Sequence, residues 1–551
     1  MKRIQFFIFC ISLIIADCSK VDSEKNTKLV RAAEDGNLNT IQTLLAKGAN
    51  PNTTKDGVPI IIWSAGNGHA EVVDLLIDKG AEVNAKDNNG ITALMITSAL
   101  GDMEVIKLLL NKGADVNVKS TDGRTALMRA TQYDHTTVVK LLLDKGANIN
   151  AKCNDGTTAL MIASQEGHND VVRLLLDRGV DINVKANEGP TALYITSQEG
   201  NTEVVKLLLD KGADINAKCN DGTTALMIAS QEGHIEVIKL LLDKGADINN
   251  ARTDNGATAL MMASQAGYIE VIKLLLDKGA DINAKSNDGC TTLMAASQEG
   301  HTEIVKFLLD KGADINARSN DGTTALWMAS ANGHSMVIKL LLDKDADVDT
   351  ERYNIGASAL YIASQKGHTE VVKLLLEKGA KVNAKITTNG TTALVMASQE
   401  GHIEVIKLLL GKGADINAQS NNGKTALISA TQHSHAEVVK LLLKKGAKLN
   451  IKDTNGTTAL LMASGNGNAN IVKLLLDKGA DPNIINNNGI TPLWVASFEG
   501  HIETVKILVN NGADLNVKVR LFDLESTALY IAKLQDYTDI VQLLEKAGAK
   551  E

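Results

Sequence analysis

Histidine is the residue type in this 551-residue chain that could most readily do chemistry, because an imidazole can serve as an acid, a base or a metal ligand. Ten of the eleven histidines recur at one position of a repeated pattern: His69, His135, His168, His234, His301, His334, His368, His402, His435 and His501. A catalytic or metal site needs dissimilar groups that converge on one point. The repeated position therefore predicts a structural role, and only His433 lies outside it.

The five cysteines do not suggest a disulfide framework. Cys10 and Cys18 belong to the apolar N-terminal segment, which leaves an odd number. Cys153 and Cys219 hold the same position two repeats apart. At the roughly 8–10 Å spacing of packed helices they would lie about 20 Å apart, whereas a disulfide needs Cα atoms within about 7 Å. We interpret them, with Cys290, as substitutions in connecting hairpins.

Three further patterns superficially suggest a ligand site. Asp214, Asn216 and Asp221 resemble part of a calcium loop, but the acidic residue that ends such a loop is missing. Residues 465–468 lack the lysine and the preceding strand of a phosphate loop. Six methionines at one repeat position are typical of core packing. The sequence therefore predicts no catalytic residues, no metal and no cofactor, and a metal-binding or enzymatic protein is the least favoured alternative.

The elements that carry these residues form an almost literal internal repeat. Fourteen glycines mark its phase, with ten spacings of 33 residues and three of 34: Gly57, Gly90, Gly123, Gly156, Gly189, Gly222, Gly256, Gly289, Gly322, Gly356, Gly390, Gly423, Gly456 and Gly489. Degenerate units precede and follow them, which gives about sixteen. Only 3% of the residues are aromatic and 45 are glycine, as expected for thin layers built from small and aliphatic side chains rather than for ordinary large cores.

Residues 222–250 show what one unit builds. Thr224 can cap a short first helix, and Gly233 breaks that helix. Apolar residues over 235–242 give a second helix a broad apolar face, and Gly245 fits its left-handed cap. Two short helices and a hairpin cannot bury such a face alone, but stacked neighbours can.

This unit resembles the ankyrin repeat, which it matches in its 33-residue period, Thr-x-Leu turn, Gly-His between helices, and Leu-Leu followed by Gly-Ala-Asp-Ile-Asn. The resemblance covers about residues 27–551. It implies an all-α repeat solenoid of about sixteen helix-turn-helix units with β-hairpin connections, and capping units at about 27–56 and 525–551.

Two departures from the family pattern are informative. The family's Thr-Pro-Leu-His is often Thr-Ala-Leu-Met here, so we expect an apolar contact in place of the hydrogen bond from the histidine. Asp345 replaces a helix-end glycine and a 34-residue spacing follows. A left-handed backbone there would cost free energy, so we expect the joint around 345–356 to be the most irregular.

The N-terminus has the pattern of an export signal. Lys2 and Arg3 precede an apolar stretch, residues 4–16, that is too short to span a bilayer. Its end, Ile15-Ala16-Asp17-Cys18, resembles a bacterial lipoprotein signal, in which the cysteine becomes the lipidated N-terminus. Asp17 departs from the usual small residue.

We therefore predict a signal peptide over residues 1–18 with lipidation at Cys18, a polar tether over 19–26 and a solenoid over 27–551. The protein would be lipid-anchored in the bacterial cell envelope, on its periplasmic or surface face, and a secreted protein is the alternative. Multiple acyl chains would hold it firmly, because each buried CH₂ contributes about 0.8 kcal/mol.

The resemblance implies that ligands meet the face made by the first helices and the hairpins. On this face we expect a stripe of glutamine and glutamate beside a stripe of lysine: Gln165, Glu166, Gln198, Glu199, Gln231, Glu232, Gln298 and Glu299, with Lys152, Lys185, Lys218 and Lys285. Exposed aromatic residues are common anchors of an interface, so Tyr133, Trp494 and Phe498 are further candidates. An alternative interpretation is a solvated face that keeps the array soluble.

The sequence thus favours a non-catalytic, monomeric scaffold for protein–protein interaction. The net charge of −8 argues against a nucleic-acid partner. The repeated Gln-Glu pairs favour a partner that is repetitive or extended, and a compact partner would bind near one end. The alternative function is an exported effector that binds host proteins.

Overall fold

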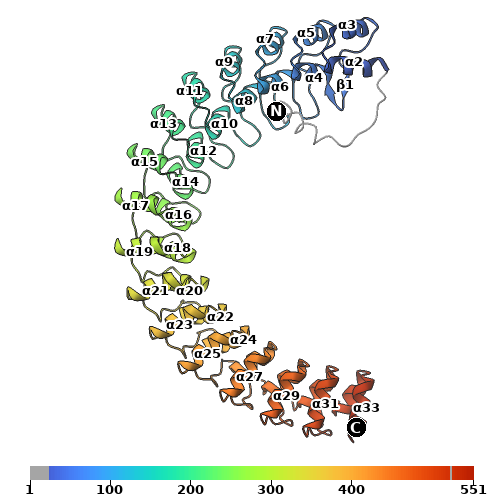
Figure 1. Cartoon of the computed structure of the whole chain (residues 1–551), viewed down its shortest axis with the longest axis vertical. Helices are drawn as coiled ribbons and strands as arrows, with labels where there is room; N and C mark the ends of the chain where they lie inside the picture. The colour runs from blue at the N-terminus through green and yellow to red at the C-terminus, as the bar shows by residue number, and fades with distance from the viewer. Residues whose placement is uncertain (1–23, 522–523, 551) are drawn as a thin grey trace. The chain divides into compact units, whose positions relative to one another are not determined.

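The computed structural model describes residues 24–521 and 524–550, and these residues form 32 helices in sixteen consecutive pairs. The chain divides into two compact units, residues 1–281 and 282–551, with eight helix pairs each. Figure 1 shows the first helices of each unit following one another in one row and the second helices in a neighbouring row. The predicted all-α solenoid of about sixteen units is confirmed.

The helices of the first unit have the following bounds. The first helices of its pairs are α2 (Glu24–Glu34), α4 (Ile60–Gly66), α6 (Ala93–Leu100), α8 (Ala126–Gln132), α10 (Ala159–Glu166), α12 (Ala192–Glu199), α14 (Ala225–Glu232) and α16 (Ala259–Ala266). The second helices are α3 (Leu38–Ala46), α5 (Ala70–Asp78), α7 (Met103–Asn111), α9 (Thr136–Asp144), α11 (Asn169–Asp177), α13 (Thr202–Asp210), α15 (Ile235–Asp243) and α17 (Ile269–Asp277). Helix α2 begins at Glu24, three residues before residue 27, where the solenoid was expected to start.

The second unit repeats this order. Its first helices are α18 (Thr292–Glu299), α20 (Ala325–Asn332), α22 (Ala359–Lys366), α24 (Ala393–Glu400), α26 (Ala426–Gln432), α28 (Ala459–Gly465), α30 (Pro492–Phe498) and α32 (Ala528–Leu534). Its second helices are α19 (Thr302–Asp310), α21 (Ser335–Asp343), α23 (Thr369–Glu377), α25 (Ile403–Gly411), α27 (Ala436–Lys444), α29 (Ala469–Asp477), α31 (Ile502–Asn510) and α33 (Thr538–Lys546).

Local chemistry sets the ends of each helix, as α14 and α15 illustrate. The hydroxyl of Thr224 accepts a hydrogen bond from the Met227 N–H at 3.4 Å, which satisfies one orphan donor at the start of α14. Gly233 ends the helix with a φ of +82°. In α15, Val237, Ile238 and Leu241 are buried. Each pair thus presents apolar residues to its neighbours, and the core is a series of thin layers.

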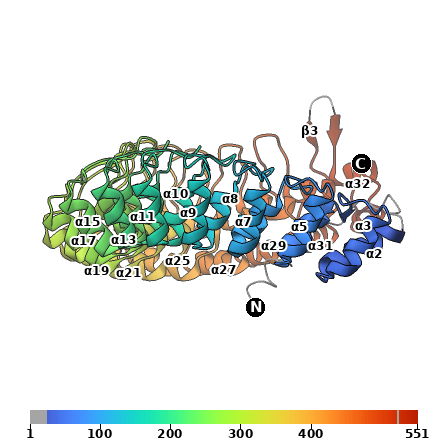
Figure 2. The same ribbon diagram turned by 90° about the horizontal axis from the view of Figure 1, so that it is seen from above.

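Connections between pairs are mostly turns. Within the described residues, paired strands occur at β1 (Thr54–Lys55) with β2 (Val58–Pro59), and at β3 (Val519–Leu521) with β4 (Leu524–Ser526), both antiparallel. Figure 2 shows β3 and β4 projecting from the side of the second unit that carries the connecting loops. The predicted β-hairpin connections are therefore present mostly as turns, and few of them contain paired strands.

The extra residue of the 34-residue units lies in the hairpin turn. In the 33-residue unit, the Gly222 N–H donates to the carbonyl of Cys219, three residues back. In the longer units, Gly256 and Gly356 donate to Arg252 and Arg352, four residues back. Asp345 has the left-handed backbone that we expected, with a φ of +63°. The hairpin around 351–358 forms the same bridge as the one around 251–258, so the longer hairpin is not peculiar to this joint.

Histidine rings join consecutive repeats. The Nε2 atom of each ring lies 2.8–3.2 Å from a backbone carbonyl oxygen of the preceding first helix at His69, His135, His168, His234, His334, His368, His402, His435 and His501. Eight of these rings lie against the interhelical glycine of the preceding repeat. The exception is His168, because the preceding repeat has Asp134 at that position. A Cβ atom on Gly200, for example, would be 2.7 Å from Nδ1 of His234. The histidine therefore contributes an inter-repeat hydrogen bond and fills the space that glycine leaves.

We expect His234→Ala to lower the free energy of local opening around α12–α15 by about 1 kcal/mol, because a carbonyl loses its partner. His234→Asn should cost less than half of that, because Asn201 at the equivalent position donates to the carbonyl of Ser164 at 3.1 Å. Amide hydrogen exchange measures both losses. Equal losses for alanine and asparagine would show that ring packing, not the hydrogen bond, stabilises this joint.

Candidate functional site

The predicted glutamine and glutamate residues lie in the last turn of the first helices α10, α12, α14 and α18. Their side chains are exposed, except that Glu232 is partly buried. The Gln298 amide donates to the Glu299 carboxylate at 3.0 Å, and Gln231 approaches Glu232 at 3.4 Å. The array therefore repeats one exposed polar pair along the ends of its first helices. Partner binding by these pairs stays a prediction.

The backbone of the same positions belongs to the joints between repeats. The carbonyl oxygen of Gln198 accepts a hydrogen bond from the His234 ring at 2.8 Å. The carbonyl of Gln298 accepts one from His334 at 2.8 Å. The backbone is thus held by the next repeat while the side chains extend to solvent, which suits a rigid surface for recognition.

The predicted lysines lie in the hairpins and make a second ladder that the sequence did not indicate. The Lys185 ammonium donates to the carbonyl of Lys218 at 2.7 Å, one repeat further on. Lys152 donates in the same way to Lys185 at 3.4 Å, and Lys285 donates to Arg318 at 3.2 Å. These ammonium groups connect neighbouring hairpins as well as placing positive charge on them.

The three aromatic candidates differ in exposure. Tyr133 follows α8 and is 41% exposed. Trp494 is only 4% exposed, and its indole N–H donates to the Ser526 hydroxyl at 3.1 Å, so its prediction as an exposed anchor is wrong. Phe498 is 36% exposed and stacks on Trp494 with 5.4 Å between ring centroids. The buried indole supports the exposed phenyl ring.

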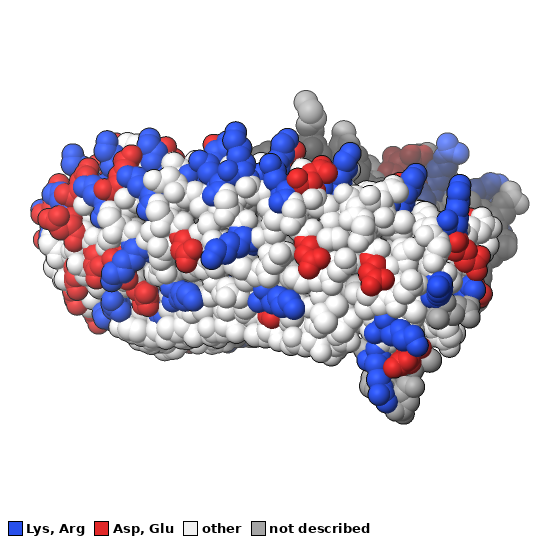
Figure 3. All heavy atoms as spheres, turned by 90° about the horizontal axis from the view of Figure 1, so that it is seen from below, with Lys and Arg blue, Asp and Glu red and all other residues white. Residues whose placement is uncertain are grey.

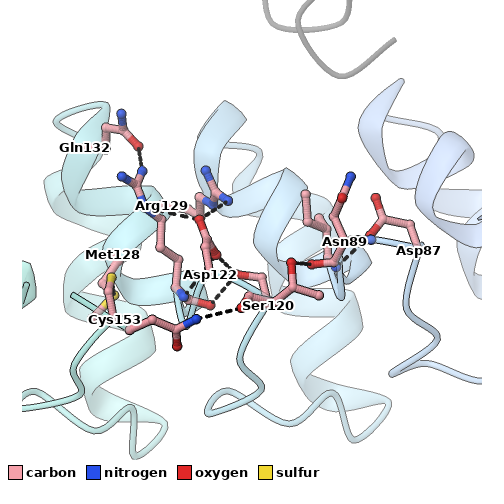
Figure 4. A network of polar contacts seen from close by, with 12 residues as sticks. Asp87, Asn89, Ser120, Asp122, Met128, Arg129, Gln132 and Cys153 are labelled. Carbon is pink, nitrogen blue, oxygen red and sulfur yellow. Dashed lines mark hydrogen bonds and ion pairs between the residues drawn. The ribbon is translucent and has the colours of Figure 1, made fainter. Parts of the chain in front are cut away.

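A polar network in the first unit includes Gln132, the residue that precedes Tyr133 in the chain (Figure 4). The Arg124 guanidinium donates to the side-chain oxygen of Gln132 at 2.9 Å. Asp122 contacts Arg124 at 3.5 Å and Arg129 at 3.7 Å. Burial opposes ionisation of Asp122, but hydrogen bonds from Ser120 and the Arg124 N–H, together with the charges of the two arginines, lower the pKa of its carboxyl.

The second unit contains a counterpart. The Lys424 ammonium donates to the side-chain oxygen of Gln432 at 2.6 Å. The neighbouring residue, His433, is exposed, and its Nδ1 lies 3.0 Å from the Ser429 carbonyl oxygen. Sequence analysis missed Arg124 and Lys424. The signal was available, because they are the only cations directly after one of the fourteen hairpin glycines.

The cysteines of the hairpins are not joined by disulfides. Cys153, Cys219 and Cys290 are free and partly buried. Burial, with nearby carboxylates, raises the pKa of Cys219 to about 11 and that of Cys290 to about 12. They are therefore protonated at neutral pH, and a protonated thiol is a weak nucleophile. Cys18 lies outside the described residues.

Two further observations concern the described part of the chain. Over residues 24–521 and 524–550, no cluster of three or more histidine, cysteine or carboxylate side chains could hold a metal ion, and no helix is long and apolar enough to cross a bilayer. On the face drawn in Figure 3, basic and acidic side chains are interspersed among uncharged atoms.

Stacked helix pairs with hairpin connections, and an exposed first-helix edge, define a helical repeat solenoid. The chain belongs to the ankyrin-repeat family, because the model for ankyrin repeats in three copies matches residues 7–87, 29–120, 94–186, 179–252, 249–319, 314–386, 383–453 and 448–519. Ankyrin repeats support a protein–protein interaction scaffold.

Two curated proteins are similar to parts of this chain. An ankyrin repeat and KH domain-containing protein of Caenorhabditis elegans, mask-1, is 36% identical over 89 residues, which is 16% of this chain. A protein of the same description from Caenorhabditis briggsae is 36% identical over 84 residues, or 15% of this chain. The aligned segments cover 3% of each relative, so the likeness extends to a few repeats.

Proposed function

We propose that this protein is a non-catalytic, monomeric scaffold that binds other proteins through the face formed by its first-helix ends and hairpins. The observation that carries the proposal is that backbone and side chains have different roles at this face. Backbone carbonyls of positions such as Gln198 and Gln298 are used in the joints, while their side chains extend to solvent at the same place in successive repeats. A rigid backbone with exposed, repeated side chains suits recognition without catalysis.

The repeated pairs favour an extended or repetitive partner. Gln165-Glu166, Gln198-Glu199 and Gln231-Glu232 follow one another in three consecutive repeats. A partner that binds one compact patch would not contact the identical Gln-Glu pairs of later repeats. An extended segment that crosses several repeats would meet the same carboxylate in each one.

The experiment is cross-linking of the tagged full chain in its native cells, followed by identification of enriched proteins. A face variant replaces Glu166, Glu199, Glu232 and Glu299 by lysine. A matched control replaces Glu203, Glu236, Glu270 and Glu303, which lie exposed on second helices, by lysine. We expect the face variant to lose protein partners and the control to keep them. The proposal fails if no protein is enriched over an unrelated bait, or if both variants keep the same partners.

The second part of the proposal is a lipid anchor at Cys18 in the bacterial cell envelope. Its support is the sequence pattern of residues 2–18, a basic start and an apolar core that ends before a cysteine. Cys18→Ala should abolish incorporation of a radioactive fatty acid and move the protein from the membrane to the soluble fraction. Unchanged labelling and fractionation would remove the anchor. Release of the wild-type protein into the medium would favour an exported effector that acts on host proteins.

A further inference from the structure

Two repeats, one in each unit, depart from the array in the same way. Residues 120–135 and 420–435 both carry a cation directly after the hairpin glycine, Arg124 and Lys424, where the other twelve hairpin glycines are followed by uncharged residues. Both carry an aromatic ring, Tyr133 or His433, at the position that is glutamate in six repeats. Four unusual residues therefore occur as two matched pairs, 300 residues apart.

The structure links the members of each pair. In the first unit, the Arg124 guanidinium holds the Gln132 side chain at 2.9 Å. In the second unit, the Lys424 ammonium holds Gln432 at 2.6 Å. The ring follows the bound glutamine directly in the chain, so the hairpin cation and the exposed ring belong to one surface. Gln231, Gln298 and Gln399 contact the neighbouring glutamate instead.

The stacking of the array does not require this arrangement. The repeat of Thr157 and Glu166 forms the same helix pair, α10 and α11, without a cation or a ring. The two special repeats also place residues other than glycine in a left-handed backbone, with φ of +59° at Asp134 and +64° at Ser434. Such a backbone is unfavourable for a residue with a Cβ atom. Arg124, Tyr133, Lys424 and His433 therefore add a local surface that the stacking of the layers does not require.

We propose that each unit contains one recognition site of this kind, and that both sites bind an extended peptide segment of a partner protein that has carboxylate side chains beside an aromatic side chain. The inference rests on the proposed scaffold function and specifies its partner.

The choice of an acidic peptide as the partner rests on charge complementarity. The ordinary repeat presents glutamate here, whereas Arg124, Arg129 and Asp122 together leave one net positive charge on the hairpin side of the first site, with Asp134 beyond the ring, and Lys424 supplies one in the second. A guanidinium or ammonium favours a carboxylate, and an exposed ring favours aromatic contact.

A protein segment fits these sites better than a nucleic acid. Each site offers one net positive charge on its hairpin side. The repeat after the first site carries Glu166, and the repeat before the second site carries Glu400. A phosphate backbone, with one charge at every nucleotide, would be repelled there and needs several cations to bind. A peptide can place its carboxylates at the cation and uncharged or basic residues at the neighbouring repeats.

The test measures binding of fluorescein-labelled 12-residue peptides, Gly/Ser-flanked around Glu-Tyr-Glu, Gln-Tyr-Gln or Lys-Tyr-Lys, to the full chain by fluorescence anisotropy. We expect the Glu-Tyr-Glu peptide to bind at least tenfold more tightly than the other two, with two sites per chain. The variants Arg124→Thr/Tyr133→Glu and Lys424→Thr/His433→Glu restore residues that the array uses in ordinary repeats, so they should fold, and circular dichroism checks this. Each should remove one site, and the fourfold variant should remove both.

Two controls make the result decisive. Asn169→Glu/Lys206→Thr makes the same charge change on second helices and should leave both sites intact. Thr157→Arg/Glu166→Tyr, which copies the special residues into an ordinary repeat, should add a third site. The inference is overturned if the Glu-Tyr-Glu peptide shows no preferential binding, if the fourfold variant binds it unchanged, or if a dT12 oligonucleotide binds tightly and loses binding in that variant.

The experiments distinguish a failure of this inference from a failure of the general scaffold function. If peptide binding fails in these ways while Glu-to-Lys replacement on the first-helix ends still removes cross-linked partners, the scaffold function stands and the two special sites do not. If both fail, the face itself is not used.

Discussion

Gly300→Ala should lower the free energy of unfolding by about 2–3 kcal/mol, although it adds one methyl group. Gly300 has a φ of +80°, and a Cβ atom there would lie 2.5 Å from Nδ1 of the His334 ring in the next repeat. The left-handed backbone alone costs roughly 1–2 kcal/mol for alanine. Displacing the ring also breaks its 2.8 Å hydrogen bond to the Gln298 carbonyl, which contributes about 0.5–1.5 kcal/mol. Urea unfolding of the full chain and hydrogen exchange at α18–α21 measure the loss.

Gly312→Ala is the matched control. Gly312 has a φ of +91°, and an added Cβ atom would meet nothing within 4 Å, so only the backbone cost of about 1–2 kcal/mol applies. Gly300→Ala combined with His334→Asn should recover part of the loss, because the shorter side chain of Asn201 leaves 3.1 Å at the equivalent glycine, Gly167. Equal losses for the two glycines would contradict the role assigned to the histidine ring.

The chain contains a natural version of this compensation. Where Ser434 replaces the interhelical glycine, the next repeat has Asn468 in place of histidine, and the asparagine amide donates to the serine hydroxyl at 2.7 Å. At the other such joint, where Asp134 replaces the glycine, the next repeat keeps His168, whose Nε2 lies 3.2 Å from the Gln132 carbonyl oxygen. A substitution at Ser434 or Asn468 should be judged by its effect on the pair.

Leu208→Ala should cost about 2–5 kcal/mol, because it removes a fully buried side chain from α13 and leaves a cavity. The neighbouring Leu207 is only partly buried, so Leu207→Ala should cost less than half as much. In a solenoid each repeat contacts its neighbours. Hydrogen exchange should therefore show the greatest loss of protection in α11, α13 and α15, and little change in α3 and α5. A loss that spreads evenly over all helices of the unit would contradict the layered packing.

Much of the fold could be predicted because its determinants are local in sequence. The threonine cap, as at Thr224, acts within three residues, and glycines such as Gly233 act on their own backbone. Because these threonines and glycines recur in each repeat, the number of helix pairs could be counted from the sequence. The N-terminal boundary was less predictable, because residues 24–26 are polar and yet lie in α2, whose apolar residues come later.

The site could be predicted only in part, because its contacts cross between repeats. Trp494 was expected to be exposed, but its partner, Ser526, lies 32 residues further on in the hairpin of β4. The lysine positions could be predicted from the sequence. Their hydrogen bonds to carbonyls of the next hairpin, as from Lys185 to Lys218, could not, because they depend on how the repeats stack. The link from Arg124 to Gln132 spans eight residues and crosses from hairpin to helix, so only comparison among repeats could have singled it out.

The central claim is that the first-helix edge, and not the second-helix surface, binds protein. The most direct measurement places a photo-activated cross-linking amino acid at Gln165 or Gln298 in one set of full-length proteins, and at Lys206 or Lys306 on second helices in another. These side chains are all exposed, so their accessibility is matched. The account predicts discrete protein adducts from the first set, absent from the second, after irradiation in native cells. Adducts only from the second-helix positions, or equal adducts from both sets, would contradict it.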